Sequence, residues 1–171
     1  MRVRAVVLLL VSVLLVSSCG RTTAWPPNQR QLSRLFDREK ATLELIEQEM
    51  EADGLLRMGP SIFSEIARNP GIPRLPSNQE IKYVALFDST QIYLNVVRRE
   101  NATVYELLIQ NDGPRLFLPR FIHTKTGSAL PGCSASMEQM ACGGCAVSLE
   151  SDWLLEFDWF PASPDEEARL C

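Results

Sequence analysis

The sequence lacks the motifs that mark the common hydrolytic and nucleotide-dependent enzymes. It contains no G-x-S-x-G nucleophile elbow, no glycine-rich loop that cradles a phosphate, and no H-E-x-x-H zinc motif. It has a single histidine, His123, and no pair of acidic residues that stands out as a glycosidase-like couple. Few groups are therefore available for acid–base chemistry, and we expect a protein that is not an enzyme.

The sequence also lacks an apolar run long enough to cross a bilayer, which takes about 20 residues. The longest run, residues 5–16, is interrupted only by Ser12 and is preceded by Arg2 and Arg4. Two serines follow it directly. A charged start, a short apolar core and small residues at the junction are typical of a secretory signal peptide, predicted here for residues 1–18.

The four residues Val16-Ser17-Ser18-Cys19 resemble the lipobox of bacterial lipoproteins. The resemblance covers residues 1–20 only. It implies that Cys19 carries a diacylglyceryl group on its thiol and, after cleavage, a fatty acid on its new amine. Gly20 replaces the aspartate that commonly retains Gram-negative lipoproteins in the inner membrane. The resemblance therefore implies an outer-membrane protein that faces the periplasm, with the lipid on Cys19 as its one attached group.

Positive charge is scarce in the mature chain. The precursor has 17 basic and 21 acidic residues, and loss of Arg2 and Arg4 leaves 15 against 21, a net charge of about −6. A negative protein gains no counterion release on nucleic acid and no net attraction to anionic lipid. We therefore expect no nucleic-acid partner, and a membrane contact through the lipid anchor. Residues 19–28 form the lipidated tether, and residues 29–171 are expected to form a single envelope domain.

An amphipathic helix is predicted directly after the tether. Asn28 and Gln31 form a capping-box-like pair at its start, and Asp53-Gly54 ends it. Acidic residues crowd its second half, which we interpret as a solvated face; the alternative is an acidic docking face for a basic partner. The apolar residues recur at spacings of three, four and seven, as one stripe of a helix requires: Leu32, Leu35, Phe36, Leu43, Ile46 and Met50.

The centre of the chain reads as a β-meander. A short helix is predicted over residues 61–68, followed by a proline-rich connection. Pro119 lies inside the last predicted strand and indicates an edge position. Four strands joined by short turns are predicted, over residues 81–87, 92–96, 103–109 and 116–122.

The C-terminal region is expected to add a hairpin of residues 146–149 and 153–160. In the second strand Trp153, Leu155, Phe157 and Trp159 alternate onto one face, although a helix beginning at Ser151 is an alternative that periodicity does not exclude. The predicted class is α+β: an N-terminal amphipathic helix on an antiparallel meander, with a disulfide-stapled C-terminal subdomain. A β-sandwich with an N-terminal helical extension is the alternative.

Four cysteines remain besides Cys19, all in the last 39 residues: Cys133, Cys142, Cys145 and Cys171. In an exported protein they predict two disulfides, with three possible connectivities. We favour structural bridges, such as Cys133 with one member of the Cys142-Gly143-Gly144-Cys145 motif and Cys171 with the other. Thiol–disulfide exchange at this C-x-x-C motif is an alternative.

The same loop offers a second alternative, copper binding. Met137 and Met140 lie among the cysteines, and His123 precedes them; such soft donors suit Cu(I). Oxidation in the envelope would consume the thiolates, so we expect no metal. The sequence as a whole predicts a lipid-anchored envelope protein with a non-enzymatic binding or assembly role. Its partner would be an envelope protein, met through the acidic helix face or the aromatic hairpin.

Overall fold

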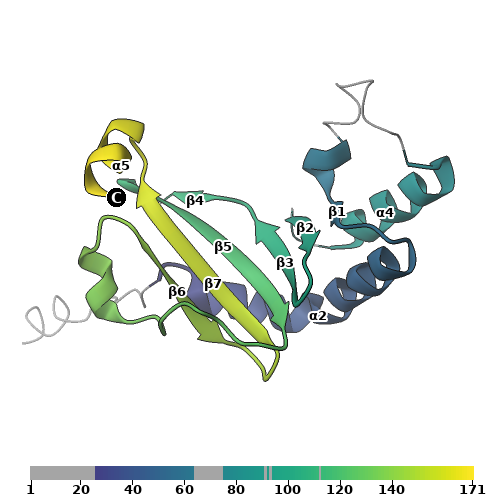
Figure 1. The fold of residues 1–171 in the computed structure, drawn as a ribbon, viewed down its shortest axis with the longest axis horizontal. Helices are drawn as coiled ribbons and strands as arrows, with labels where there is room; N and C mark the ends of the chain where they lie inside the picture. The colour runs from purple at the N-terminus through teal and green to yellow at the C-terminus, as the bar shows by residue number, and fades with distance from the viewer. Residues whose placement is uncertain (1–25, 64–74, 91, 93, 112) are drawn as a thin grey trace, which may run out of the picture.

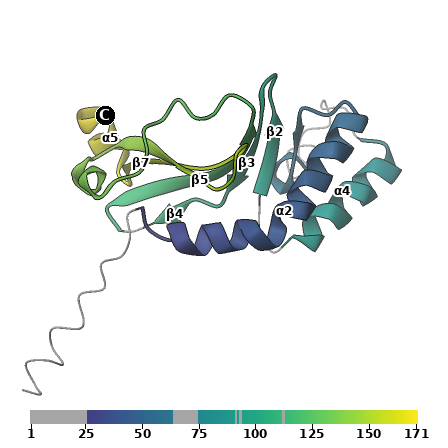
Figure 2. The same cartoon turned by 90° about the horizontal axis from the view of Figure 1, so that it is seen from below.

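The computed structural model describes residues 26–63, 75–90, 92, 94–111 and 113–171. The elements are α2 (Gln29–Ala52), β1 (Arg57–Met58), α4 (Ser77–Ser89), β2 (Leu94–Arg98), β3 (Ala102–Leu107), β4 (Gln110–Asn111), β5 (Arg115–Thr124), the 3-10 helix η1 (Ala135–Gln139), β6 (Gly143–Ser148), β7 (Trp153–Pro161) and α5 (Pro164–Leu170). The strands form one seven-stranded antiparallel sheet in the order β1-β2-β3-β5-β7-β6, and β4 pairs with β5. Helix α2 lies across one face of this sheet (Figures 1 and 2).

This arrangement confirms the α+β class with an N-terminal helix on an antiparallel sheet. The β-sandwich alternative is wrong for the described residues, because their paired strands belong to one sheet. The two disulfides lie in the C-terminal region, as expected. However, β6 and β7 continue the same sheet beyond β5, so the stapled region is an extension of the main core.

Helix α2 forms where its apolar stripe predicts it. Leu32, Phe36, Leu43, Ile46 and Met50 are all buried against the sheet. The ring of Phe36 lies 5.5 Å from that of Phe121 on β5 and 5.0 Å from that of Trp153 on β7. Such aromatic contacts add to the free energy of burial and fix how the helix crosses the strands.

The predicted capping box at the start of α2 does not form. Asn28 adopts a left-handed backbone with φ of 64°, and its side chain makes no cap hydrogen bond. Instead its amide donates to Oε1 of Gln110 on β4, at 3.2 Å. The Asn28 side chain thus binds a residue of the sheet and not the first turn of its own helix. This contact fixes the beginning of α2 on the sheet.

The hairpin of β6 and β7 confirms the predicted strand over residues 153–160 against the helical alternative. Trp153, Leu155 and Phe157 are fully buried and Trp159 is 2 % exposed. Their alternation places all four on the face that α2 covers. The aromatic hairpin is thus part of the core, and its inward face is not available as a docking surface.

The strand predicted over residues 81–87 is wrong, because these residues belong to α4. Tyr83 and Phe87, one turn apart, are buried, whereas Ile81 is 70 % exposed. A short apolar run has no periodicity that separates a buried strand from a helix. The helix predicted over residues 61–68 has its described part at residues 60–63, and the rest lies outside the described residues.

Pro119 does not lie on an edge strand. It is in β5, which pairs with β7 on one side and with β3 and β4 on the other. The pairing with β3 ends at Glu106 and Arg120, and resumes in β4 opposite Phe117. This interruption accommodates a proline inside a sheet, because the residue has no N–H to donate.

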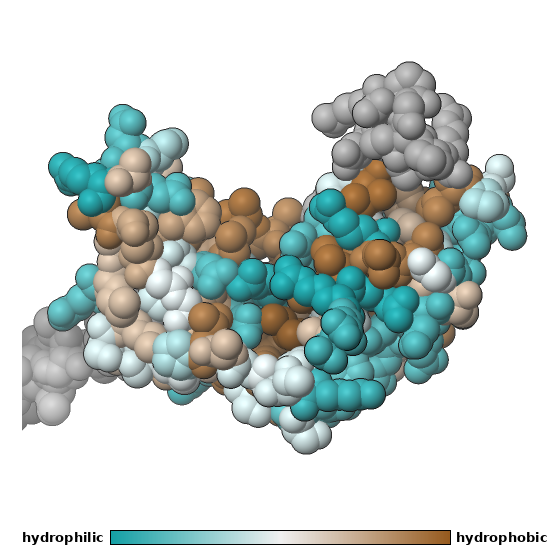
Figure 3. Space-filling model, viewed as in Figure 1, coloured by the Kyte–Doolittle hydropathy of each residue, from teal (hydrophilic) through white to brown (hydrophobic). Residues whose placement is uncertain are grey.

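No helix among the described residues is both long enough and apolar enough to cross a membrane. The longest, α2, has 24 residues, but its apolar residues lie along one stripe. The face of the sheet opposite α2 carries an ion cluster of Arg120, Glu156 and Asp158. The surface on this side is hollowed and shows polar side chains between apolar ones (Figure 3).

Candidate functional site

The four C-terminal cysteines form two disulfides, Cys133–Cys145 and Cys142–Cys171. Each member of the C-x-x-C motif therefore pairs outside the motif, as in the structural arrangement favoured from the sequence. Cys145 is fully buried in β6 and belongs to the hydrophobic core. Cys171 follows α5 and holds the C-terminus against the loop that precedes β6. Both bridges act as staples in this state, and neither presents a free thiolate.

The donors considered for copper are not assembled into one site. Met137 packs against the core, and Met140 is 49 % exposed. His123 pairs with Trp153 on β7, whereas Cys145 pairs with Phe157, four residues further along the same strand. At the rise of a strand that separation is about 13 Å. The described residues contain no group of three or more His, Cys, Asp or Glu side chains arranged to hold a metal ion. Cys19 lies outside the described residues.

His123 instead links α2, the sheet and the β6–β7 turn. Its Nδ1 is 2.7 Å from Oε2 of Glu47 on α2, and its Nε2 is 3.2 Å from Oδ2 of Asp152. The imidazole stacks on Trp153 with 4.6 Å between ring centroids and 9° between planes. Glu47 also accepts hydrogen bonds from Thr103 and Tyr105 on β3.

The two carboxylates decide the protonation of His123. Burial acts to lower its pKa, but the hydrogen bonds and charges of Glu47 and Asp152 outweigh burial and raise the pKa above the usual value. This environment favours the imidazolium more than water does, because each of its N–H groups can donate to a carboxylate. A ring with both nitrogens occupied has no lone pair for a substrate proton. His123 is consequently suited to fixing α2 on the sheet and not to acting as a general base.

The acidic half of α2 is occupied by partners of the same chain. Lys82 on α4 binds both Glu49 and Asp53, at 2.8 and 2.5 Å. Hydrogen bonds from Lys82 and then Tyr83 hold the pKa of Asp53 below its usual value. Glu44 lies 3.6 Å from Lys40, and Glu51 lies 3.8 Å from Arg98. The side chains of Glu44 and Glu51 stay 40 % and 73 % exposed, so the carboxylates in this half of the helix have partners within the chain without all being withdrawn from solvent.

The exposed face of the first half of α2 is basic. Arg30, Arg34 and Arg38, which we call the arginine stripe, repeat every four residues and so lie along one side of the helix. All three side chains are exposed, and none forms an ion pair or hydrogen bond within the described residues. The negative net charge of the chain conceals this stripe, although the spacing of the arginines is visible in the sequence.

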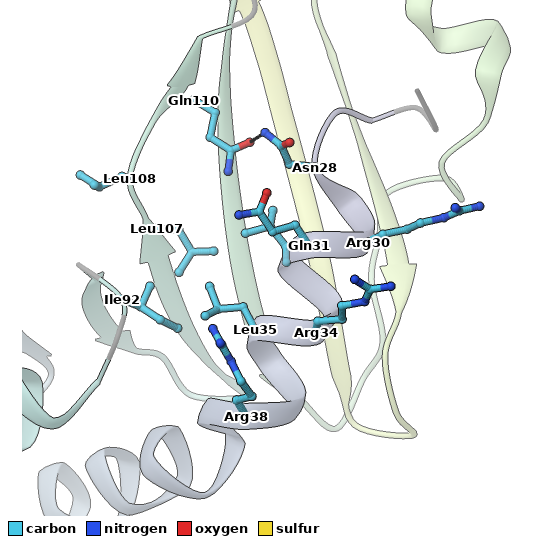
Figure 4. A pocket seen from close by; sticks show the side chains of 11 residues that line it. Asn28, Arg30, Gln31, Arg34, Leu35, Arg38, Ile92, Leu107, Leu108 and Gln110 are labelled. Atoms are coloured by element: carbon cyan, nitrogen blue, oxygen red, sulfur yellow. Dashed lines mark hydrogen bonds between the residues drawn. The ribbon is translucent and has the colours of Figure 1, made fainter. Parts of the chain in front are cut away.

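A groove of about 970 Å³, which we call the α2 groove, lies beside the stripe between α2 and the β3–β4 edge (Figure 4). Leu35, Ile92 and Leu107 point toward one another along its floor, and Arg38 lies beside Leu35 (Figure 4). The Asn28–Gln110 hydrogen bond closes the other end. The volume is at the upper end of the range for small-molecule sites. Among the described residues, the α2 groove combines an apolar floor with cations that have no partner.

No family model, curated protein or solved structure matches this chain. Its function must therefore be inferred from its own residues. The strongest features are the lipobox-like junction at Cys19, the paired cysteines, and the α2 groove with its arginine stripe.

Proposed function

We propose that the protein is a lipid-anchored protein of the bacterial envelope with a non-enzymatic binding or assembly role. The observation that carries this proposal is Cys19, placed directly after a charged start and a short apolar core. Two acyl chains or more on Cys19 would hold the protein in the membrane permanently, whereas one chain anchors only marginally. The proposed membrane is the outer membrane, with the domain in the periplasm.

The disulfides support the proposed location in the periplasm. All four cysteines after Cys19 are paired, and such bridges persist in oxidising compartments such as the periplasm. The non-enzymatic role is supported by His123, whose two ring nitrogens both lie against carboxylates. The binding surface we propose is the α2 groove, because the acidic half of α2 has internal partners and the aromatic hairpin faces the core.

The anchor is tested by growing cells with an alkyne-bearing fatty acid and detecting the label on the protein. We expect the native chain to be labelled, and the Cys19→Ser chain to be unlabelled and to keep its signal peptide. The matched control is Cys142→Ser/Cys171→Ser, which replaces two other cysteines and keeps Cys19. This chain should be labelled normally. An unlabelled native chain, or label that survives Cys19→Ser, contradicts the anchor.

The membrane is tested by separating inner and outer membranes on a density gradient. We expect the native protein in the outer-membrane fraction, and Gly20→Asp to move it to the inner membrane. Gly20→Ala is the matched control and should leave the protein in the outer membrane. Recovery of the native protein in the inner membrane would contradict this part of the proposal.

A further inference from the structure

The charge on α2 is divided in a way that net charge conceals. Residues 29–38 carry three arginines and one aspartate, although the mature chain is about −6. Acidic residues are in excess overall, yet no carboxylate pairs with the arginine stripe in the described residues. Elsewhere, Lys40, Lys82, Arg98 and Arg120 each lie within 4.0 Å of at least one carboxylate. The stripe is therefore a concentrated positive surface on a negative protein.

The remaining cations without an ion pair do not form a comparable surface. They are Arg57, Arg99, Lys125 and Arg169; Arg99 and Lys125 line one hollow, which Glu51 and Glu100 also line, and Arg57 and Arg169 lie on separate segments of the described chain. The stripe, in contrast, places three guanidinium groups along one helix face. Guanidinium groups bind phosphate oxygens through planar, paired N–H donors, so this face suits a row of phosphate groups.

The apolar surface next to the stripe restricts further which kind of anionic ligand fits. The floor of the α2 groove is formed by leucine and isoleucine side chains, and Leu108 at its rim is 60 % exposed. A free phosphate or a nucleic acid would leave this apolar surface in water. A lipid supplies both parts, since its head group carries the negative charge and its acyl chain is apolar.

We infer that the arginine stripe and the α2 groove form a docking surface for anionic phospholipid of the membrane that holds the anchor. Head-group phosphates lie on Arg30, Arg34 and Arg38, and an acyl chain contacts the floor of the groove. This inference rests on the proposed lipid anchor. Asn28 is nine residues after Cys19, so even a fully extended tether keeps the start of α2 within about 32 Å of the anchored residue.

The role of this surface is orientation. A lipid on Cys19 holds the protein at the membrane but does not by itself determine which face of the domain meets the bilayer. Contact through the stripe would place α2 against the bilayer and direct the opposite face of the sheet, with Arg120, Glu156 and Asp158, toward the periplasm. The overall negative charge of the rest of the chain favours the same orientation, because anionic lipid repels it.

The test uses the mature chain, residues 19–171, with Cys19→Ser, so that no covalent lipid contributes. Binding is measured by flotation with vesicles of phosphatidylcholine alone and with vesicles that also contain phosphatidylglycerol. We expect binding to the anionic vesicles only, with a loss at high salt. Arg30→Gln/Arg34→Gln/Arg38→Gln should weaken binding to the anionic vesicles at least about tenfold, because all three arginines add to the attraction for anionic lipid.

The matched control removes the same charge elsewhere, in Arg57→Gln/Arg99→Gln/Arg169→Gln. We expect this chain to bind the anionic vesicles nearly as well as the parent, and both triple variants to keep the parent melting temperature. Leu108→Ser tests the apolar part and should weaken binding without changing its dependence on salt. Equal binding by the two triple variants, or equal binding to neutral vesicles, overturns the inference.

Two competitors separate the lipid from other anions. Short-chain phosphatidylglycerol should displace the vesicles, whereas glycerol phosphate and a polyglutamate peptide at the same concentration should not. Displacement by the peptide would identify an acidic protein as the partner and overturn the inference. The outcome is independent of the labelling experiment on Cys19. Unlabelled Cys19 with selective binding to anionic vesicles would defeat the proposed anchor alone, and a labelled Cys19 without this binding would defeat the docking surface alone.

Discussion

Glu47 on α2 lies 2.7 Å from Nδ1 of His123 on β5, although the two residues are 76 positions apart in the sequence. This contact connects the helix to the centre of the sheet at a point where Tyr105 also reaches the helix. The Tyr105 hydroxyl lies 2.9 Å from the carbonyl oxygen of Leu43 and 3.1 Å from Glu47. Burial, followed by the charge of Glu47, raises the pKa of Tyr105, so it stays a neutral donor. The cluster is polar, half-buried and fully partnered.

Removal of His123 should therefore destabilise the fold. We expect His123→Gln to lower the free energy of unfolding by about 1–2 kcal/mol, because a charge-assisted hydrogen bond is lost and Glu47 keeps only its neutral donors. The measurement is denaturant unfolding, in a double-mutant cycle with Glu47→Gln. His123→Gln on a Glu47→Gln background should cost clearly less. Additive losses would show that the two side chains are not coupled.

The same contact predicts a dependence of stability on pH. The pKa of His123 is raised in the folded state, so its stabilising contribution is fully present below the unfolded value of 6.5 and is lost as pH rises through the folded pKa. The charged groups that contact it are Glu47 on α2 and Asp152 in the β6–β7 turn. We expect the gap in melting temperature between the native protein and His123→Gln to shrink from about pH 6 to about pH 9. A gap that widens over this range would contradict the assignment.

Periodicity predicted the elements that carry a long, one-sided pattern. Helix α2 has an apolar stripe from Leu32 to Met50, and the residues from Trp153 to Trp159 alternate strictly, so each pattern had enough residues to identify its period. The strand predicted over residues 81–87 is wrong because seven mostly apolar residues fit the period of a helix as well as that of a strand. The decisive features of α4 are tertiary: Tyr83 packs into the core, and Lys82 binds Glu49 on α2 and Asp53 directly after it.

The candidate site could be predicted from the sequence less well than the fold, for two physical reasons. The partners of Glu47 and Lys82 lie far along the chain, and no local spacing indicates which charges meet. The arginine stripe is local, but it becomes informative only once the structure shows that no carboxylate among the described residues pairs with it. The pairing of Cys133 with Cys145 is likewise one of three connectivities that the sequence allowed, and the fold selects it.

The two disulfides should differ in their response to reductant. Cys145 is fully buried in β6 and its partner Cys133 is half-buried, whereas Cys171 is exposed at the chain end and Cys142 is half-buried. Thiol–disulfide exchange requires access of the attacking thiolate to sulfur. We expect limited reduction to open Cys142–Cys171 first, as measured by alkylation and mass spectrometry of peptides. The protein should retain its fold at that stage, because the core staple remains.

The same experiment tests the redox alternative. An exchange-active C-x-x-C motif would pass through a Cys142–Cys145 bridge, and that peptide pair should be absent under all oxidising conditions. The variant Cys133→Ala/Cys145→Ala should lose about 3 kcal/mol of stability, the value expected for a bridge with a sequence separation of 12. A Cys142–Cys145 peptide in the native protein would revive the oxidoreductase interpretation.

Gly59, just after β1, should tolerate no side chain. Its φ is 149°, and a Cβ atom built there would lie 2.8 Å from Cα of Asn95 and 2.9 Å from the carbonyl oxygen of Leu94. Both are backbone atoms of β2, so the clash is relieved only by moving β1 away from the sheet. The Asn95 side chain is also fixed, since its Oδ1 accepts a hydrogen bond from the Ser61 hydroxyl at 2.6 Å.

We therefore expect Gly59→Ala to lower the free energy of unfolding by about 2 kcal/mol or more, through strain and loss of pairing between β1 and β2. Gly132→Ala is the matched control: nothing lies within 4 Å of its built Cβ, and its φ is outside the left-handed region, so its stability should change little. The measurement is denaturant unfolding together with amide exchange at Val96 and Val97, the partners of β1. Equal stability of the two variants would mean that β1 does not depend on the close approach of Gly59 to β2.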